Sequence, residues 1–103
     1  MNYKFRKTPV KIEAFQMTEE RGQNNIDWPQ WLHMVWNMEN NEVGSVFSSI
    51  FPNSDGTDLL KLQTEDGEMF IDWGDFIIKD INNRISVCNS KLFYSIYEEI
   101  IDV

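Results

Sequence analysis

Two turn signals that lie between short apolar segments constrain the fold more than any other feature of the sequence. Asp66-Gly67 lies between "DLLKLQT" and "EMFIDW", and Asn82-Asn83 lies between "FIIKDI" and "RISVC". Asp-Gly is a strong signal for a tight β-hairpin, and asparagine tolerates the left-handed backbone that such a turn requires. The sequence therefore predicts two antiparallel hairpins in its second half.

The first half adds further strand signals. Apolar and polar residues alternate in "PVKIEAFQM", residues 9–17, which is typical of a strand, and "GSVFSSIFP" is a second, shorter candidate. The polar segment "TEERGQNNI" is predicted to be a loop. Near the end of the chain, "NSKLFYSIYEEI" predicts a short helical turn, started by Asn89 or Ser90 and followed by extended chain.

One segment, "DWPQWLHMVWNM", has the spacing of an amphipathic helix. Positions i, i+3, i+4, i+7 and i+8 are occupied by Trp28, Trp31, Leu32, Val35 and Trp36. Asp27 is a suitable cap, and Pro29 fits in a first helical turn, where its missing N–H is not needed. We expect the main helix at about residues 27–39, with most of its tryptophans in the core.

The fold class predicted from these signals is α+β. The chain has 103 residues, of which 42% are hydrophobic, and this length suits one domain, residues 1–103, with one core. We expect a curled antiparallel sheet of about five to seven strands with the main helix packed on it.

The net charge and the cysteine count indicate which classes of partner and which cellular compartment suit this chain. The net charge of −8 disfavours nucleic acids and anionic membranes, because affinity for both depends on positive charge. Cys88 is the only cysteine, and the first residues lack the apolar stretch of a secretory signal. We expect a protein of the cytoplasm.

Catalytic and metal-binding groups are sparse. His33 is the only histidine and lies off the tryptophan stripe, so we expect it to be a solvated surface residue. One histidine and one cysteine cannot make a His/Cys zinc site, and a dyad of His33 with Cys88 would need distant elements to meet. "NSDGTD" resembles half a calcium loop, but Thr64 stands where the twelfth-position glutamate would be. We therefore expect no enzyme activity, no metal and no cofactor.

Aromatic and basic residues are the features that suggest a ligand. The rings of Trp28, Trp31, Trp36, Trp73, Tyr94 and Tyr97 are candidates for a stacking pocket, where each base would contribute roughly 1–3 kcal/mol. The main basic cluster holds Lys4, Arg6, Lys7 and Lys11, and arginine is well suited to phosphate. The alternatives are that the tryptophans form the core and that the cations are solvated.

Both ends of the chain resemble a widespread family of small bacteriophage and prophage proteins. The opening pattern, Arg-Lys-x-Pro-Val-x-Ile-Glu-Ala, is matched at Arg6, Lys7, Pro9, Val10, Ile12, Glu13 and Ala14. The closing pattern, Gly-Asp-aromatic-Ile-Ile followed by Cys, Phe and Tyr-Glu, is matched at Gly74, Asp75, Phe76, Ile77, Ile78, Lys79, Cys88, Phe93 and Tyr97. The chain departs from the family at Asp80 and Asn83, where glycines are usual, and at Ser86-Val87-Cys88, where Tyr-Pro-Cys is usual.

The resemblance implies a protein made by a phage inside its host, and two functions fit such a protein. The first is a non-catalytic anti-defence sponge, expected to be a homo-oligomer, that sequesters a nucleotide-derived immune signal. Its candidate ligand-binding residues are Arg6, Lys7, Trp28, Trp31, Trp73, Asp75 and Lys79. The alternative is an interaction protein that inhibits a host protein by direct contact, or a minor virion component.

Overall fold

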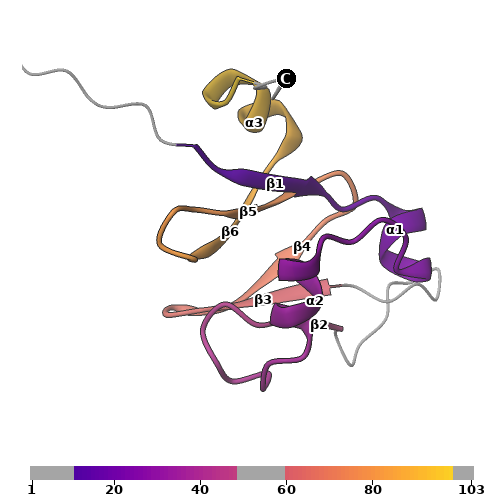
Figure 1. Cartoon of the computed structure of the whole chain (residues 1–103), viewed down its shortest axis with the longest axis vertical. Helices are drawn as coiled ribbons and strands as arrows, with labels where there is room; N and C mark the ends of the chain where they lie inside the picture. Colours follow the sequence, from indigo (N-terminus) through magenta and orange to yellow (C-terminus); the bar gives the residue numbers. More distant parts are fainter. Residues whose placement is uncertain (1–10, 49–59, 99–103) are drawn as a thin grey trace, which may run out of the picture.

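The structure is a computed structural model and describes residues 11–48 and 60–98 (Figure 1). The strands in these ranges are β1 (Glu13–Gln16), β2 (Val46–Ser48), β3 (Leu60–Thr64), β4 (Gly67–Ile71), β5 (Phe76–Lys79) and β6 (Ile85–Cys88). The helices are α1 (Glu19–Asn24), α2 (Gln30–Trp36) and α3 (Ser90–Ile96). The predicted α+β class with antiparallel strands is therefore confirmed.

The strands form two sheets where the sequence predicted one curled sheet. One sheet has the order β1-β5-β6 and the other the order β2-β3-β4, and every pairing is antiparallel. The division falls at the short corner between β4 and β5, where Gly74 has a φ of +100°. The chain turns there before the next strand begins, so β4 and β5 join different sheets.

The main core draws on both sheets. Its buried residues are Phe15, Met17, Trp28, Leu32, Val46, Leu60, Leu62, Ile71 and Ile77. On the opposite face of the first sheet, Phe76 is buried beneath α3, whose Phe93 ring stacks on the Phe76 ring with 3.8 Å between centroids. Figure 1 shows α3 beyond this sheet, at the end of the molecule away from β2 and β3.

Both predicted hairpins form, but their turns differ from the expectation. In the first, Thr64 pairs with Gly67, so Glu65 and Asp66 make the turn and Gly67 (φ +122°) begins β4. In the second, the Asp80 N–H donates to the Arg84 carbonyl at 3.0 Å. The loop between them has three residues, and only Asn83 (φ +62°) is left-handed.

Side-chain oxygens explain why these turns close. The Asp80 Oδ1 accepts hydrogen bonds from the N–H groups of Asn82 (2.8 Å) and Arg84 (3.0 Å). The Thr64 Oγ1 accepts from the Asp66 N–H at 3.2 Å. Aspartate and threonine commonly bind turn N–H groups in this way, so each turn is fixed by the residue before it.

The helical prediction is right in place and wrong in extent. α2 is shorter than the expected range of about 27–39, and Pro29 occupies its N-cap position without a side-chain hydrogen bond. The expected cap, Asp27, instead has a φ of +63°. The segment predicted as a polar loop contains α1, because the Thr18 side chain caps it by accepting from the Arg21 N–H at 3.2 Å. At α3, the predicted cap Asn89 is confirmed, since its side chain accepts from the Lys91 N–H.

Candidate functional site

Two of the predicted ligand-binding tryptophans come from the helical stripe and lie at the core. Trp28 is 7% exposed, and its indole N–H donates to the Arg21 carbonyl at 2.8 Å. Trp31 is half-buried and packs against the core. His33 is exposed, as expected, and its ring centroid lies 5.5 Å from that of Trp28. Because most of the Trp28 surface is already covered by protein, this ring offers little area to a stacked ligand.

Trp73 and Asp75 lie in the corner between β4 and β5. A methyl group added at Gly22 of α1 would lie 2.6 Å from the Trp73 Cη2, so the ring rests against the backbone of α1. The Met17 N–H donates to the Asp75 carbonyl at 2.8 Å, and the Gly74 N–H donates to the Met17 carbonyl at 2.7 Å. Trp73 and the backbone of this corner therefore hold α1 and the end of β1 in place.

The Asp75 carboxylate also stabilises this corner. Its Oδ2 accepts a hydrogen bond from the Asp72 N–H at 3.0 Å. Burial raises the pKa of Asp75 above its ordinary value and the nearby charge of Asp72 adds to the increase, while the hydrogen bond opposes both. A carboxylate in this position would repel a phosphate group.

Lys79 lies at the other end of β5 from this corner. Its Nζ is 3.7 Å from the Glu13 Oε2 of β1, in a half-exposed ion pair. The structure therefore separates Lys79 from Asp75 and Trp73 and does not bring the three into one pocket. Arg6 and Lys7 lie outside the described residues.

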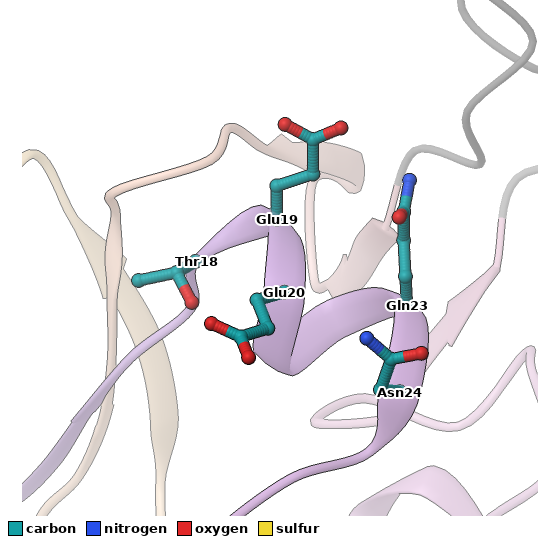
Figure 2. Close-up of a pocket in the computed structure, with 5 residues that line it drawn as sticks. All are labelled: Thr18, Glu19, Glu20, Gln23 and Asn24. Carbon is teal, nitrogen blue, oxygen red and sulfur yellow. The ribbon is translucent and has the colours of Figure 1, made fainter.

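A shallow, open depression runs along α1 and is lined by Thr18, Glu19, Glu20, Gln23 and Asn24 (Figure 2). Figure 2 shows that the carboxylates of Glu19 and Glu20 point in different directions. All five lining residues belong to one short helix and its cap, and the depression holds two negative charges and no positive one. Such a surface is poorly suited to an anionic nucleotide.

The titratable side chains of the described residues do not form a metal-binding group. Within residues 11–48 and 60–98, no three His, Cys, Asp or Glu side chains are placed to hold a metal ion. His33 is on α2 and its ring lies beside Trp28, whereas Cys88 is on β6 and its thiol donates to the Asn89 carbonyl at 3.5 Å. Among α1, α2 and α3, the helices of the described residues, none has the length and apolar character of a membrane span.

Strand β4 has an exposed apolar surface that was not predicted from the sequence. Met69 is 47% exposed and Phe70 is 55% exposed, although both lie in a regular strand. They point to opposite faces of the sheet: Met69 pairs with the buried Leu62, whereas Phe70 pairs with Lys61. The signal that would have found this surface is the run Met69-Phe70-Ile71, because three consecutive apolar residues give a strand two apolar faces.

The surroundings of β4 are acidic. Glu65 and Asp66 form the turn before the strand, Glu68 lies within it and Asp72 follows it, and all four are exposed. Lys61 pairs with Glu68 at 2.8 Å and lies 4.9 Å from the centre of the Phe70 ring. An apolar strand with an acidic border is thus exposed on the second sheet.

A second exposed apolar surface lies on α3. Three of its seven residues are large, apolar and more than half exposed, namely Leu92 (58%), Tyr94 (70%) and Ile96 (62%), and none of the seven is buried. The helix is held by its aromatic contacts, with Phe93 stacked on Phe76 and Tyr94 edge-on to both rings. Exposed apolar side chains are therefore found on β4 of one sheet and on α3, which packs on the other sheet.

Comparisons with models of protein families, with curated proteins and with solved structures found no match to this chain. The resemblance to small phage proteins stays a prediction from the sequence.

Proposed function

We propose that this protein acts without catalysis, by direct contact with another protein, through strand β4 and the acidic residues that border it. The observation that carries the proposal is the exposure of Met69 and Phe70 on opposite faces of one strand. Exposed apolar groups with a polar border are typical of protein interaction sites. In the phage setting that the resemblance implies, the partner is a host protein.

Direct contact ranks ahead of nucleotide sequestration because of where the sequence-predicted ligand residues lie. A sponge needs rings and cations that converge on one ligand. Trp28 and Trp31 are part of the core or packed on it, and Lys79 is paired with Glu13 away from Trp73. The remaining support for a sponge comes from Arg6 and Lys7, outside the described residues.

The net charge of the protein predicts the sign of the charge on the partner's surface. A net charge of −8 attracts positively charged surfaces over several ångströms and raises the rate at which they meet the protein. Aromatic and methionine side chains then supply the apolar contact area after the encounter. The partner is therefore expected to present apolar side chains bordered by lysine or arginine.

The test places a photoreactive phenylalanine analogue at Phe70, or at the exposed turn residue Asn82 as a control, in protein made in bacterial cells. We expect one specific crosslinked protein from Phe70 and none from Asn82. That protein is then purified and titrated with the unmodified chain, and Phe70→Ser should weaken binding at least about tenfold, or 1.4 kcal/mol. Equal binding by the variant would contradict the proposal.

Native mass spectrometry separates this proposal from the sponge. The purified full chain is incubated with a panel of cyclic and ADP-ribose-derived nucleotides, and we expect no retained mass. A retained nucleotide that is lost on Arg6→Ala would instead support sequestration, since arginine is the stronger phosphate-binding candidate. Conversion of a nucleotide during the incubation would contradict the absence of catalysis.

A further inference from the structure

The hydrogen bonds of β3 determine which backbone groups of β4 are free. The Gln63 N–H donates to the Ser45 carbonyl at 2.9 Å, and the Gly44 N–H donates to the Gln63 carbonyl at 2.9 Å. The backbone N–H and C=O groups of Gln63 therefore both point toward the segment that leads into β2. Because backbone groups alternate in direction along a strand, those of Leu62 and Thr64 point the other way, toward β4.

On β4, the partners of these two residues are Met69 and Gly67. Their N–H and C=O groups face β3, so the N–H and C=O groups of Glu68 and Phe70 face the outer edge. Within the described residues, β4 has no neighbour on that side, and no backbone hydrogen bond reaches Glu68 or Phe70 there. Both residues are exposed, so a segment of another chain can approach this edge.

We infer that the outer edge of β4 binds an extended, basic segment of a partner protein as an additional strand. The inference rests on the proposed function and adds the binding mode and the chemistry of the partner. Strand addition obtains affinity from main-chain hydrogen bonds and specificity from alternating side chains. An exposed sheet edge is a template for such pairing.

The charge of the edge favours a basic occupant. Carboxylates stand before, within and after the strand, at Glu65, Asp66, Glu68 and Asp72. The nearest cation, Lys61, is already paired with Glu68. Opposite charges across a strand pair are favourable, so lysine or arginine on the added strand would lie best opposite these residues.

The same charges disfavour a second copy of this chain as the occupant. A two-fold antiparallel pairing centred on Met69 places Asp66 opposite Asp72 of the other copy. Centring the pairing on Phe70 places Glu68 opposite Asp72. Centring it on Glu68 places that residue opposite itself, and like charges directly opposite are destabilising in every case.

The two faces of β4 give the added strand a pattern. Glu68 and Phe70 point to the outer face, while Met69 points to the inner face beside Leu62. A matching segment carries basic residues on its outer face and aliphatic residues on its inner face. A peptide that alternates lysine and valine has this pattern.

The test uses the full chain labelled with ¹⁵N and a nine-residue peptide of alternating lysine and valine. We expect the peptide to shift the amide signals of Glu68 and Phe70 and to slow their hydrogen exchange at least about tenfold. A peptide of the same sequence with its alternate, edge-facing amides N-methylated keeps the charges and side chains but lacks these hydrogen-bond donors. It should give no slowing, and equal slowing by both peptides would overturn the inference.

Charge is tested with a matched pair of variants. Glu68→Lys, on β4, should weaken binding of the lysine-valine peptide at least about tenfold, whereas Glu20→Lys, on α1, makes the same change in net charge and should alter it less than about twofold. Thermal melting confirms that both variants fold. Equal weakening by the two would show nonspecific attraction and overturn the assigned site.

Three results distinguish this inference, its occupant and the proposed function from one another. A partner that crosslinks through Phe70 but leaves the Glu68 and Phe70 amides unprotected would keep the proposed contact and refute strand addition. Concentration-dependent dimerisation in sedimentation, with protection of the same amides in the absence of peptide, would refute the basic partner in favour of a second copy. Lack of any Phe70 crosslink, with peptide binding intact, would count against the proposed function alone.

Discussion

Strands β4 and β5 carry the same sequence signal and have opposite environments. Each contains three consecutive apolar residues, 69–71 in β4 and 76–78 in β5. In β5 all three are buried, at 8%, 0% and 3% exposure, whereas in β4 only Ile71 is buried, and Met69 and Phe70 are about half exposed. A run of apolar residues thus indicates two apolar faces but not whether both are covered.

The difference comes from the position of each strand in its sheet. β5 is the central strand between β1 and β6, and α3 covers the face that does not meet the core. β4 is at the edge of its sheet within the described residues. Apolar residues in a central, doubly covered strand contribute to stability, whereas the same residues at an edge are free to contribute to binding.

The largest expected effect is the loss of stability on Ile77→Ala. Ile77 is 0% exposed and belongs to the main core, so its truncation removes buried surface and leaves a cavity. The free energy of unfolding should fall by about 2–5 kcal/mol, measured by urea denaturation. A fall below about 1 kcal/mol would show that β5 is not the covered strand of the pair.

The stack between α3 and β5 should give a smaller, measurable coupling. In a double-mutant cycle of Phe76→Leu and Phe93→Leu, the two losses should differ from additivity by about 0.5–1.5 kcal/mol, because stacked rings contribute beyond their buried area. Met69→Leu combined with Phe93→Leu is the control pair and should be additive. An additive result for Phe76 and Phe93 would mean that α3 does not cover β5 in solution.

Phe70→Ser should change the free energy of unfolding by less than about 1 kcal/mol. The ring is 55% exposed, and the Lys61 Nζ lies 4.9 Å from its centre. Such a contact contributes about 0.5–1 kcal/mol at an exposed site. Urea denaturation measures the change, and a loss as large as that of Ile77→Ala would erase the difference between the strands.

The smallest expected effect concerns Asp75, in the corner that joins the two strands. Because its pKa is raised in the folded state, the folded protein holds this proton more tightly than the unfolded chain. Its favourable contribution is present in acid and is lost as the pH rises through the folded-state pKa. Asp75→Asn should therefore raise Tm relative to the wild type at pH 7.

This difference in Tm should shrink as the pH falls toward the ordinary value of 3.8. Melting curves between pH 7 and pH 4 measure it, and Asp66→Asn, in an exposed turn, is the control. A difference that grows in acid would contradict the raised pKa.

The sequence predicts local structure here better than it predicts assembly. The hairpins, the tryptophan stripe and the cap at Asn89 follow from neighbouring residues, and all appear near their expected places. The split into two sheets depends on the corner at Gly74 and on contacts with Met17, more than fifty positions earlier. No local pattern reports such a contact.

The candidate site was predicted less well for a related reason. Aromatic residues suit both cores and ligand pockets, so the sequence left both roles open for each tryptophan, whereas the tertiary structure buries Trp28 and packs Trp31 against the core. The exposure of Phe70 likewise depends on which strands neighbour β4. Helix α1 is different, because Thr18 followed by Glu19 and Glu20 is a local start signal that could have been recognised.

The pairing of β1 with β5 has a consequence for the order of events during synthesis. Phe15 lies opposite Ile77, about sixty positions later, so β1 leaves the ribosome long before its partner exists. At roughly 5–20 residues per second, the delay is on the order of 3–12 seconds. The β3–β4 hairpin has only two residues in its turn and can close at once, within about 1–10 µs. The β3–β4 hairpin can therefore form while β1 is still without its partner strand.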